Sequence, residues 1–175
     1  MKIRQAKLAD AEKILAVYAP YVEKTCITFE TQVPSLQEFQ ARMEAISEKF
    51  PYLVAEADGE ILGYAYAHTY YARAAYDWTV EVSIYVNGEK RQSGIGKALY
   101  DVLEEALAQQ SIINLLACIS LPNEASIAFH RKRGFEQIAH FKKVGYKFGQ
   151  WRDTIWMQKR LKDVAIPEPI VYKGD

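Results

Sequence analysis

Cysteine and histidine are scarce in this chain, and long hydrophobic runs are missing. The 175 residues include two cysteines, Cys26 and Cys118, and three histidines, and neither type forms a closely spaced pair. A disulfide framework or a thiolate metal site is therefore not expected, and two distant cysteines suit a reducing compartment. No apolar run approaches membrane-spanning length, and the N-terminus lacks a hydrophobic signal region. We predict a cytoplasmic protein that uses no metal and does not enter a membrane.

An excess of charge of either sign is also missing. Lys plus Arg and Asp plus Glu number 22 each, which gives a formal net charge of zero. A broad basic face for nucleic acid is therefore not expected. Half of the residues are hydrophobic, and a chain of this length suffices for one domain with a substantial core.

Hydrophobic periodicity predicts strands and helices in a mixed order. Strands are predicted at residues 2–5, 52–57, 61–69, 79–86, 112–120, 135–142 and 153–159. Helices are predicted after residue 10 and at residues 36–49, 97–109 and 123–133. Pro20 is expected to end or kink the first helix, and Asp58-Gly59 predicts a tight hairpin turn. Helices between strands in this order predict the α/β class with a mixed sheet.

The segment EKRQSGIGKALYDVLEEAL places Gly94 and Gly96 at the head of an apolar-periodic helix. A P-loop would need glycine where Arg91 stands and Ser or Thr where Ala98 stands. A dinucleotide fingerprint would need a third glycine where Leu99 stands. The remaining pattern, Arg-x-x-Gly-x-Gly after a strand, lets backbone amides and a helix N-terminus approach a diphosphate. A tight glycine-rich turn without a ligand is the alternative interpretation.

This loop resembles the coenzyme A diphosphate loop of the GCN5-related N-acetyltransferases (GNAT). The later segment LPNEASIAFHRKRGF is similar to that family's motif of Asn, short helix and aromatic or His before Gly-Phe. ITFET, AYDWTVEVSIYV and GYKFGQWRDTIWMQ extend the likeness to phosphinothricin and methionine sulfoximine acetyltransferases. The resemblance implies the GNAT fold, a mostly antiparallel central sheet flanked by helices. It implies one domain at residues 1–161 and a surface tail at residues 162–175.

The resemblance further implies acetyl-CoA as the co-substrate, without a metal. The diphosphate is expected at the glycine loop, and the pantetheine arm on strand main chain and Asn123. The predicted cofactor-binding residues are Ile84, Tyr85, Val86, Arg91, Gln92, Ser93, Gly94, Ile95, Gly96, Lys97, Asn123 and Ser126. Asparagine before a helix is equally a favoured N-cap, so both roles stay open for Asn123.

Acetyl transfer to an amine needs a proton acceptor, donors for the carbonyl oxygen and a route for the thiol to leave. Glu81 lies on the polar face of the strand before the loop, and the resemblance places a catalytic glutamate there. His130 stands where relatives carry Tyr or His, and it is predicted to protonate the thiolate or assist deprotonation. The alternatives are a solvated strand carboxylate and a packed or capping histidine.

For the acceptor, the resemblance implies a small amino-acid analogue. Arg73, in the aromatic loop YYARAAYDW, can grip a carboxylate bidentately. The predicted substrate-binding residues are Phe29, Thr31, Arg73, Tyr76 and Trp78. The aromatic members would serve core or subunit packing equally well. Methionine sulfoximine relatives often have a second Arg where this chain has Ala74 or Ala75, which leaves the exact acceptor open.

The predicted activity is acetyl transfer from acetyl-CoA to the α-amino group of phosphinothricin, methionine sulfoximine or methionine sulfone. Two alternatives remain: another amine acceptor (polyamine, aminoglycoside or protein N-terminus), or a non-catalytic acyl-CoA binding module. A polycation would favour an acidic groove, and the acceptor loop carries Arg73 against Asp77 without an acidic cluster. The C-terminal GYKFGQW segment, by the same resemblance, predicts a homodimer.

Overall fold

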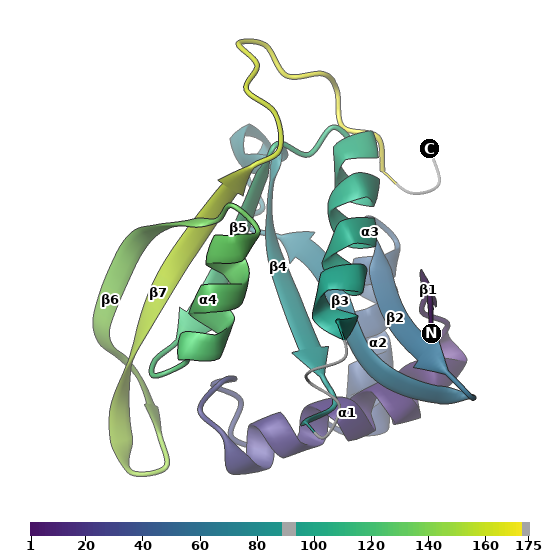
Figure 1. Cartoon of the computed structure of the whole chain (residues 1–175), viewed down its shortest axis with the longest axis vertical. Coiled ribbons are helices and arrows are strands. Elements are labelled where there is room, and N and C mark those ends of the chain that lie inside the picture. The colour runs from purple at the N-terminus through teal and green to yellow at the C-terminus, as the bar shows by residue number, and fades with distance from the viewer. Residues whose placement is uncertain (89–93, 173–175) are drawn as a thin grey trace.

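The chain folds around one sheet, and a computed structural model describes residues 1–88 and 94–172. The strands are β1 (Lys2–Gln5), β2 (Tyr52–Ala57), β3 (Glu60–Thr69), β4 (Thr79–Val86), β5 (Asn114–Ser120), β6 (Glu136–Lys147) and β7 (Gln150–Arg160). The helices are α1 (Ala11–Lys24), α2 (Leu36–Ser47), α3 (Ile95–Gln109) and α4 (Glu124–Lys132), with short 3₁₀ turns η1 (Leu8–Asp10) and η2 (Ala74–Tyr76). Figure 1 shows their arrangement.

The sheet has seven strands in the order β1-β2-β3-β4-β5-β7-β6. β4 and β5 pair in parallel, and the other neighbours pair antiparallel. The predicted mixed, mostly antiparallel sheet flanked by helices is therefore confirmed. β4 is central in this order, so Glu81 does not lie on an edge strand.

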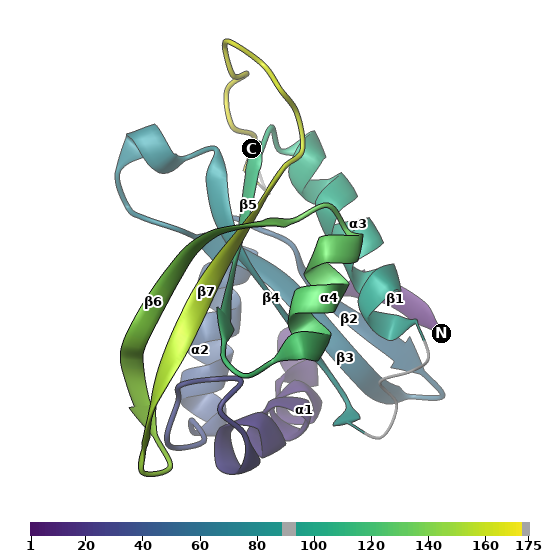
Figure 2. The ribbon, with the colours of Figure 1, turned by 60° about the vertical axis from the view of Figure 1, so that its left-hand side comes forward.

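Helices cover both faces of the sheet, as Figures 1 and 2 show. On one face, Leu99 and Leu103 of α3 pack with Val80 of β4 in the larger apolar cluster. On the other, Val22 of α1 packs with Tyr64 of β3 in the second cluster. Each fully buried aliphatic side chain of this size contributes about 1.5–3 kcal/mol to folding. The buried faces of these helices carry apolar residues at helical spacing, as periodicity predicts, although Leu36 and Val102 are 39% and 38% exposed.

The predicted hairpin turn is present between β2 and β3. Asp58 and Gly59 have φ angles of 51° and 78°. Positive φ at both central residues is the type I′ geometry that matches the twist of two antiparallel strands. The prediction from Asp-Gly is therefore confirmed.

Pro20 does not end the first helix. α1 continues to Lys24, and Tyr21 and Val22 beyond the proline are 7% and 1% exposed. A proline inside a helix removes one backbone hydrogen bond and costs about 3 kcal/mol. Burial of the next turn offsets that cost, which local sequence rules do not register.

The final hairpin is longer than predicted. β6 and β7 extend to a turn at Phe148 and Gly149, whereas the expected strands stop near residues 142 and 153. Six large apolar side chains on this hairpin are about half exposed or more: Ile138, Phe141, Val144, Tyr146, Phe148 and Trp151. The β6–β7 pairing also shifts register between Phe141 and Gly145, which breaks the alternating pattern. We call these six residues the hairpin patch.

The tail after β7 is tied to the body of the protein. Ile170 and Tyr172 pack against the larger cluster, while Ile166 is 85% exposed. The indole N–H of Trp78 donates to the main-chain oxygen of Glu168 at 2.7 Å. The tail therefore runs over the surface as a strap anchored at Trp78.

Within the described ranges, no group of three His, Cys, Asp or Glu side chains is placed to hold a metal ion. No helix in the same part of the chain is both long and apolar enough to cross a bilayer.

The β6–β7 hairpin depends on a glycine. A Cβ atom at Gly145 would lie 2.2 Å from Cε2 of Phe29, so the phenyl ring occupies the space of a side chain. Gly145→Ala should reduce the free energy of unfolding by about 1–3 kcal/mol, because the ring or the strand must move. Urea unfolding measures the loss.

Two further variants test whether the loss of stability comes from the contact between residue 145 and Phe29. Gly88→Ala is a matched control, because a Cβ there meets nothing within 4 Å. In a Phe29→Ala background, Gly145→Ala should cost much less, since the clashing ring is gone. Equal costs in both backgrounds would contradict the contact.

Candidate active site

A cleft opens where β4 and β5 separate. Their pairing ends at Glu81 opposite Leu116, although β4 continues to Val86 and β5 to Ser120. β4 stays paired with β3, and β5 with β7. The two strands are thus held firmly on their outer sides while their inner sides diverge.

Two cavities occupy this cleft. The outer one, of about 360 Å³, is lined by residues that include Ile84, Val86, Gly94, Gly96, Asn123 and Phe129. The inner one, of about 60 Å³, is lined by residues that include Val82, Ser83, Tyr100, Cys118 and His130. An elongated ligand can therefore lie along β4, with its far end between the diverging strands.

Every second residue of β4 directs its main chain into this cleft. The Asn87 N–H donates to Leu62 O at 2.8 Å, so in the antiparallel ladder the preceding residue, Val86, makes no bond to β3. Counting back in steps of two, Ile84 and Val82 likewise direct their N–H and C=O groups away from β3, but the parallel bridge between Glu81 and Leu116 already uses the Val82 N–H. These groups are the natural partners for an extended amide-bearing ligand.

The same alternation corrects part of the predicted main-chain set. Tyr85 and Ser83 form hydrogen-bonded pairs with β3, so their main-chain groups are already used. At Val86, the hydroxyl of Tyr21 donates to the main-chain oxygen at 2.5 Å and accepts from the N–H at 3.3 Å. Of the predicted main-chain contacts, Ile84 is therefore the best placed, and Val82 joins it.

The start of α3 forms one rim of the outer cavity. Gly94 is its N-cap, with φ of 75°, and a Cβ there would meet nothing within 4 Å. A Cβ at Gly96 would lie 3.3 Å from the ring of Phe129, so this glycine serves close packing against α4. Ile95 is fully buried, which leaves only its main chain for a ligand. The two glycines thus serve different purposes. Gly94 leaves its backbone open to a ligand, and Gly96 allows close packing against α4.

A lysine extends from this rim. Lys97 is exposed and its amine lies 2.6 Å from the Asp101 carboxylate. The predicted contacts of Arg91, Gln92 and Ser93 lie outside the described residues. Gly94, Gly96 and Lys97 are the loop residues that line the outer cavity.

The start of α4 forms the opposite rim. The Asn123 side-chain oxygen accepts a hydrogen bond from the Ser126 N–H at 3.2 Å, so the N-cap interpretation of Asn123 is confirmed. Asn123 and Ser126 also line both cavities. This capping hydrogen bond therefore holds the Asn123 side chain beside the path that a ligand would take through the two cavities.

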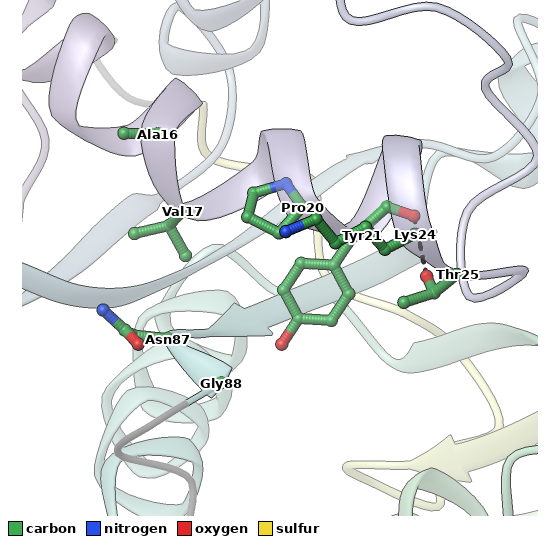
Figure 3. Close-up of a pocket in the computed structure, with 8 residues that line it drawn as sticks. All are labelled: Ala16, Val17, Pro20, Tyr21, Lys24, Thr25, Asn87 and Gly88. Carbon is green, nitrogen blue, oxygen red and sulfur yellow. Dashed lines mark hydrogen bonds between the residues drawn. The ribbon is translucent and has the colours of Figure 1, made fainter.

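Tyr21 lines the outer cavity and also a further pocket of about 210 Å³ over α1, which Figure 3 shows. That pocket is lined by residues that include Ala16, Pro20, Asn87 and Gly88. Pro20 has no N–H to donate to the carbonyl of Ala16, and both residues line this pocket. Sequence reasoning missed Tyr21, because apolar helical spacing marks it only as a core residue.

His130 is held neutral inside the protein. It is 3% exposed, and burial is the main cause that lowers its pKa. Nδ1 lies 2.8 Å from the Ser126 main-chain oxygen, which can only accept, so Nδ1 carries the proton. Nε2 therefore accepts from the Tyr100 hydroxyl at 3.0 Å. Both ring nitrogens are engaged by protein groups, so His130 is placed to orient Tyr100 and the inner wall.

Glu81 lies at the point where the strands separate. Its side chain is 24% exposed, and burial raises the pKa of the carboxyl group above its usual range. His68, directly opposite on β3, places Nε2 3.7 Å from the Glu81 carboxylate and opposes that rise. A partly buried carboxylate with a raised pKa is a suitable proton acceptor near neutral pH.

Other side chains near Glu81 are neutral. Cys118 on β5 has its pKa raised to about 11 by burial, with a further contribution from the Glu81 charge. Burial also raises the pKa of Tyr66 and of Tyr70. The Tyr70 ring contacts Trp156 of β7 edge-on, at 5.8 Å between centroids. These groups, which local sequence patterns cannot bring together, form the wall around Glu81.

The five predicted substrate-binding residues lie in different parts of the structure. Arg73 and Tyr76 lie in the exposed loop that Tyr70 begins, and Tyr76 contacts Tyr70 at 5.7 Å. Phe29 packs over Gly145 of β6, and Thr31 is exposed. Trp78 is a correction, because its indole N–H is bonded to the tail.

The cleft suits a long ligand with a diphosphate at one end and a thioester at the other. Backbone space at Gly94 and the N-terminus of α3 suit the diphosphate. Main-chain groups of Val82 and Ile84 suit an extended arm with amides. Glu81 lies beyond the arm, where a proton acceptor is needed. The residues present therefore fit acetyl-CoA.

Comparison with known proteins agrees with this geometry. The family profile of the Acetyltransferase (GNAT) domain matches residues 3–156. The chain is 34% identical over 170 residues to phosphinothricin N-acetyltransferase of Streptomyces viridochromogenes, covering 97% of this chain and 93% of that protein. It is 37% identical over 161 residues to the L-methionine sulfoximine/L-methionine sulfone acetyltransferase of Pseudomonas paraeruginosa, covering 91% and 94%.

A solved structure is similar over the same length. A GNAT superfamily phosphinothricin acetyltransferase from Sinorhizobium meliloti in complex with AcCoA superposes with a TM-score of 0.91 at 36% identity. The match covers 96% of this chain and 92% of that one. The resemblance read from the motifs is therefore confirmed.

The neutral state of His130 predicts a pH-dependent stability. The unfolded chain binds a proton near the ordinary value of 6.5, whereas the buried ring binds it only at lower pH. Stability should therefore fall as the pH drops through that value. His130→Gln removes this contribution, so wild type should lose stability relative to the variant between about pH 7.5 and 5.5. Urea unfolding at both pH values measures the difference, and parallel losses would show that the ring titrates normally.

Proposed function

Because this chain belongs to the GNAT family of acetyltransferases, its reaction is acetyl transfer from acetyl-CoA, and we propose a small amino-acid analogue as the acceptor. The proposed acceptors are phosphinothricin, methionine sulfoximine and methionine sulfone, attacked through the α-amino group. The observation that carries the proposal is the position of Glu81. This carboxylate lies where β4 and β5 part, near Tyr70, the residue that begins the loop of Arg73.

Acetyl-CoA would be held by groups from three elements. The amides at the start of α3, around Gly94 and Gly96, would bind its diphosphate. Val82 and Ile84 would pair with the pantetheine arm, and Asn123 would face it from α4. Acetyl-CoA supplies a thioester whose carbonyl carbon is the electrophile.

Glu81 is the proposed proton acceptor. An amino acid near neutral pH presents an ammonium group, which must lose a proton before its nitrogen can attack. When the N–C bond forms and the C–S bond breaks, the nitrogen loses a second proton, and the sulfur gains one. The balance is one proton released to solvent in each turnover, and Glu81 receives it first.

His130 takes a narrower role in this proposal than the sequence suggests. With Nδ1 donating to a carbonyl and Nε2 accepting from Tyr100, it has no free position toward a thiolate. We assign it as a positioning residue that fixes the Tyr100 hydroxyl at the inner cavity. This assignment agrees with its lowered pKa, because burial disfavours the charged form of the ring.

Arg73 is the proposed anchor for the acceptor carboxylate. It lies on the loop between β3 and β4, which brings Tyr70 near Glu81 and Trp156. A guanidinium group binds a carboxylate through two parallel hydrogen bonds, which would orient the α-amino group. Phe29, Thr31 and Tyr76 stay proposed wall residues, and Trp78 leaves the set.

The hairpin patch supports the further proposal of a homodimer. It gathers six exposed apolar side chains on one hairpin, and Trp151 contacts Tyr146 edge-on at 5.3 Å between centroids. Contiguous apolar surface of this kind is typical of association sites. Location in the cytoplasm and the absence of nucleic-acid and membrane partners stay proposals, which the zero net charge supports.

The acceptor class is tested by release of free thiol. With acetyl-CoA present, phosphinothricin, methionine sulfoximine or methionine sulfone should give thiol at rates well above polyamines, aminoglycosides and peptides. If only polyamines, aminoglycosides or peptides gave thiol, the acceptor would belong to that group of amines instead. No turnover with any amine, despite acetyl-CoA binding in calorimetry, would favour the binding module.

The same assay tests the base. Glu81→Gln should bind acetyl-CoA normally and lose about 10²–10⁴-fold in kcat, the usual contribution of a positioned base. An isosteric amide keeps the shape of the site but cannot accept the proton. Unchanged turnover would remove Glu81 from the proposal.

The dimer is tested by charge in the hairpin patch. Trp151→Glu should shift the protein from dimer to monomer in sedimentation velocity, because an apolar interface cannot bury an unpaired carboxylate. Ile166→Glu, at an even more exposed apolar residue of the tail, is the control and should leave the dimer intact. A monomeric wild type would contradict the proposal.

A further inference from the structure

A histidine faces Glu81 across two strands of the sheet. His68 and Glu81 are opposite each other on β3 and β4, with Nε2 and Oε2 3.7 Å apart. Nδ1 of His68 lies 3.1 Å from the main-chain oxygen of Thr69, which can only accept a hydrogen bond. Nδ1 therefore carries a proton, and Nε2 is the nitrogen that can take or give one toward the carboxylate.

The described titratable groups around this pair are neutral. The Tyr66 ring packs beside the imidazole, with centroids 6.0 Å apart. Tyr66, Tyr70 and Cys118 also interact with the Glu81 charge, and burial keeps each protonated and neutral near pH 7. Among the described residues, His68 is the charged neighbour that acts on Glu81.

The pair also leads from the cleft toward solvent. Glu81 is 24% exposed and His68 is 35% exposed, so the imidazole is the more accessible of the two. Each turnover leaves one proton that must reach solvent, and Glu81 must be ionised again before the next. A histidine changes its charge near neutral pH, which suits both tasks.

We propose that His68 is the positioning residue that shares the Glu81 proton, keeps the carboxylate ready to accept and passes the proton to solvent. In this step the O–H bond of protonated Glu81 breaks and the N–H bond at Nε2 forms. The imidazolium then releases its proton to water or buffer. The proposal rests on Glu81 as the base, and its test is separable from the test of that role.

The pH dependence of kcat/KM is the first test. A base acts in its ionised form, and loss of a neighbouring positive charge makes the carboxylate harder to ionise. His68→Gln should therefore move the acidic limb of the profile upward by about one pH unit, allowing for partial exposure. Acetyl-CoA affinity, measured by calorimetry, should not change.

Rescue is the second test. In weak buffer, His68→Ala should turn over more slowly than wild type, and added imidazole should restore part of the rate. A role in packing alone would not respond to imidazole. His140→Gln is the matched control, because His140 pairs with Asp153 at 2.8 Å across β6 and β7, away from the cleft. Its profile should match that of wild type.

The outcomes are distinct. If Glu81→Gln loses turnover but the His68→Gln profile overlays wild type and imidazole has no effect, the His68 proposal is overturned and the base stands. If Glu81→Gln keeps turnover, both are overturned. Thermal unfolding verifies that each variant is folded, and His68→Asn replaces His68→Gln if that variant is not.

Discussion

The backbone hydrogen bonds that β4 and β5 do not form are the feature on which the rest of the site depends. Pairing between these strands stops at Glu81, yet each strand remains bonded on its outer side. Ile84 thus presents a fixed donor and acceptor to the cleft, and Val82 presents a fixed acceptor. Unpaired backbone groups in a sheet favour a ligand that pairs with them, because leaving such groups buried without partners is costly.

Two helices begin at the rims of the cleft that this separation opens. α3 begins with Gly94 at one rim, and α4 begins with Asn123 at the other. Helix N-termini carry unpaired N–H groups and a partial positive charge. A ligand with a diphosphate and an amide-bearing arm therefore meets complementary groups along its whole length.

Charge is distributed unevenly along this cleft. His130 at the inner wall is neutral, because it is buried and bonded to Tyr100 and Ser126. Glu81 is less buried and faces His68, the group whose charge favours its ionised form. The two histidines of this site, His130 and His68, thus differ in solvent access and in the groups that they contact.

Local chemistry accounts for what sequence predicted well. Asp58-Gly59 sets a turn that favours positive φ angles, and Asn before a helix is a favoured N-cap. In each case the relevant contacts lie within a few residues along the chain, so the signal is present in the sequence.

Errors arose where distant contacts outweigh local preference. Pro20 does not end α1, because the turn that follows is buried against the sheet. Trp78 was assigned to the acceptor, but its indole binds the tail, ninety positions away in the chain. Neither outcome follows from neighbouring residues.

The sequence by itself determined the class of fold and the family, and it singled out Glu81 as the proposed base. The tertiary structure decided which main-chain groups of β4 are free, how His130 is bonded and that His68 faces Glu81. The reason is physical. Periodicity and turn chemistry act between near neighbours, whereas strand register, burial and the pairing of side chains arise only when separate elements pack together.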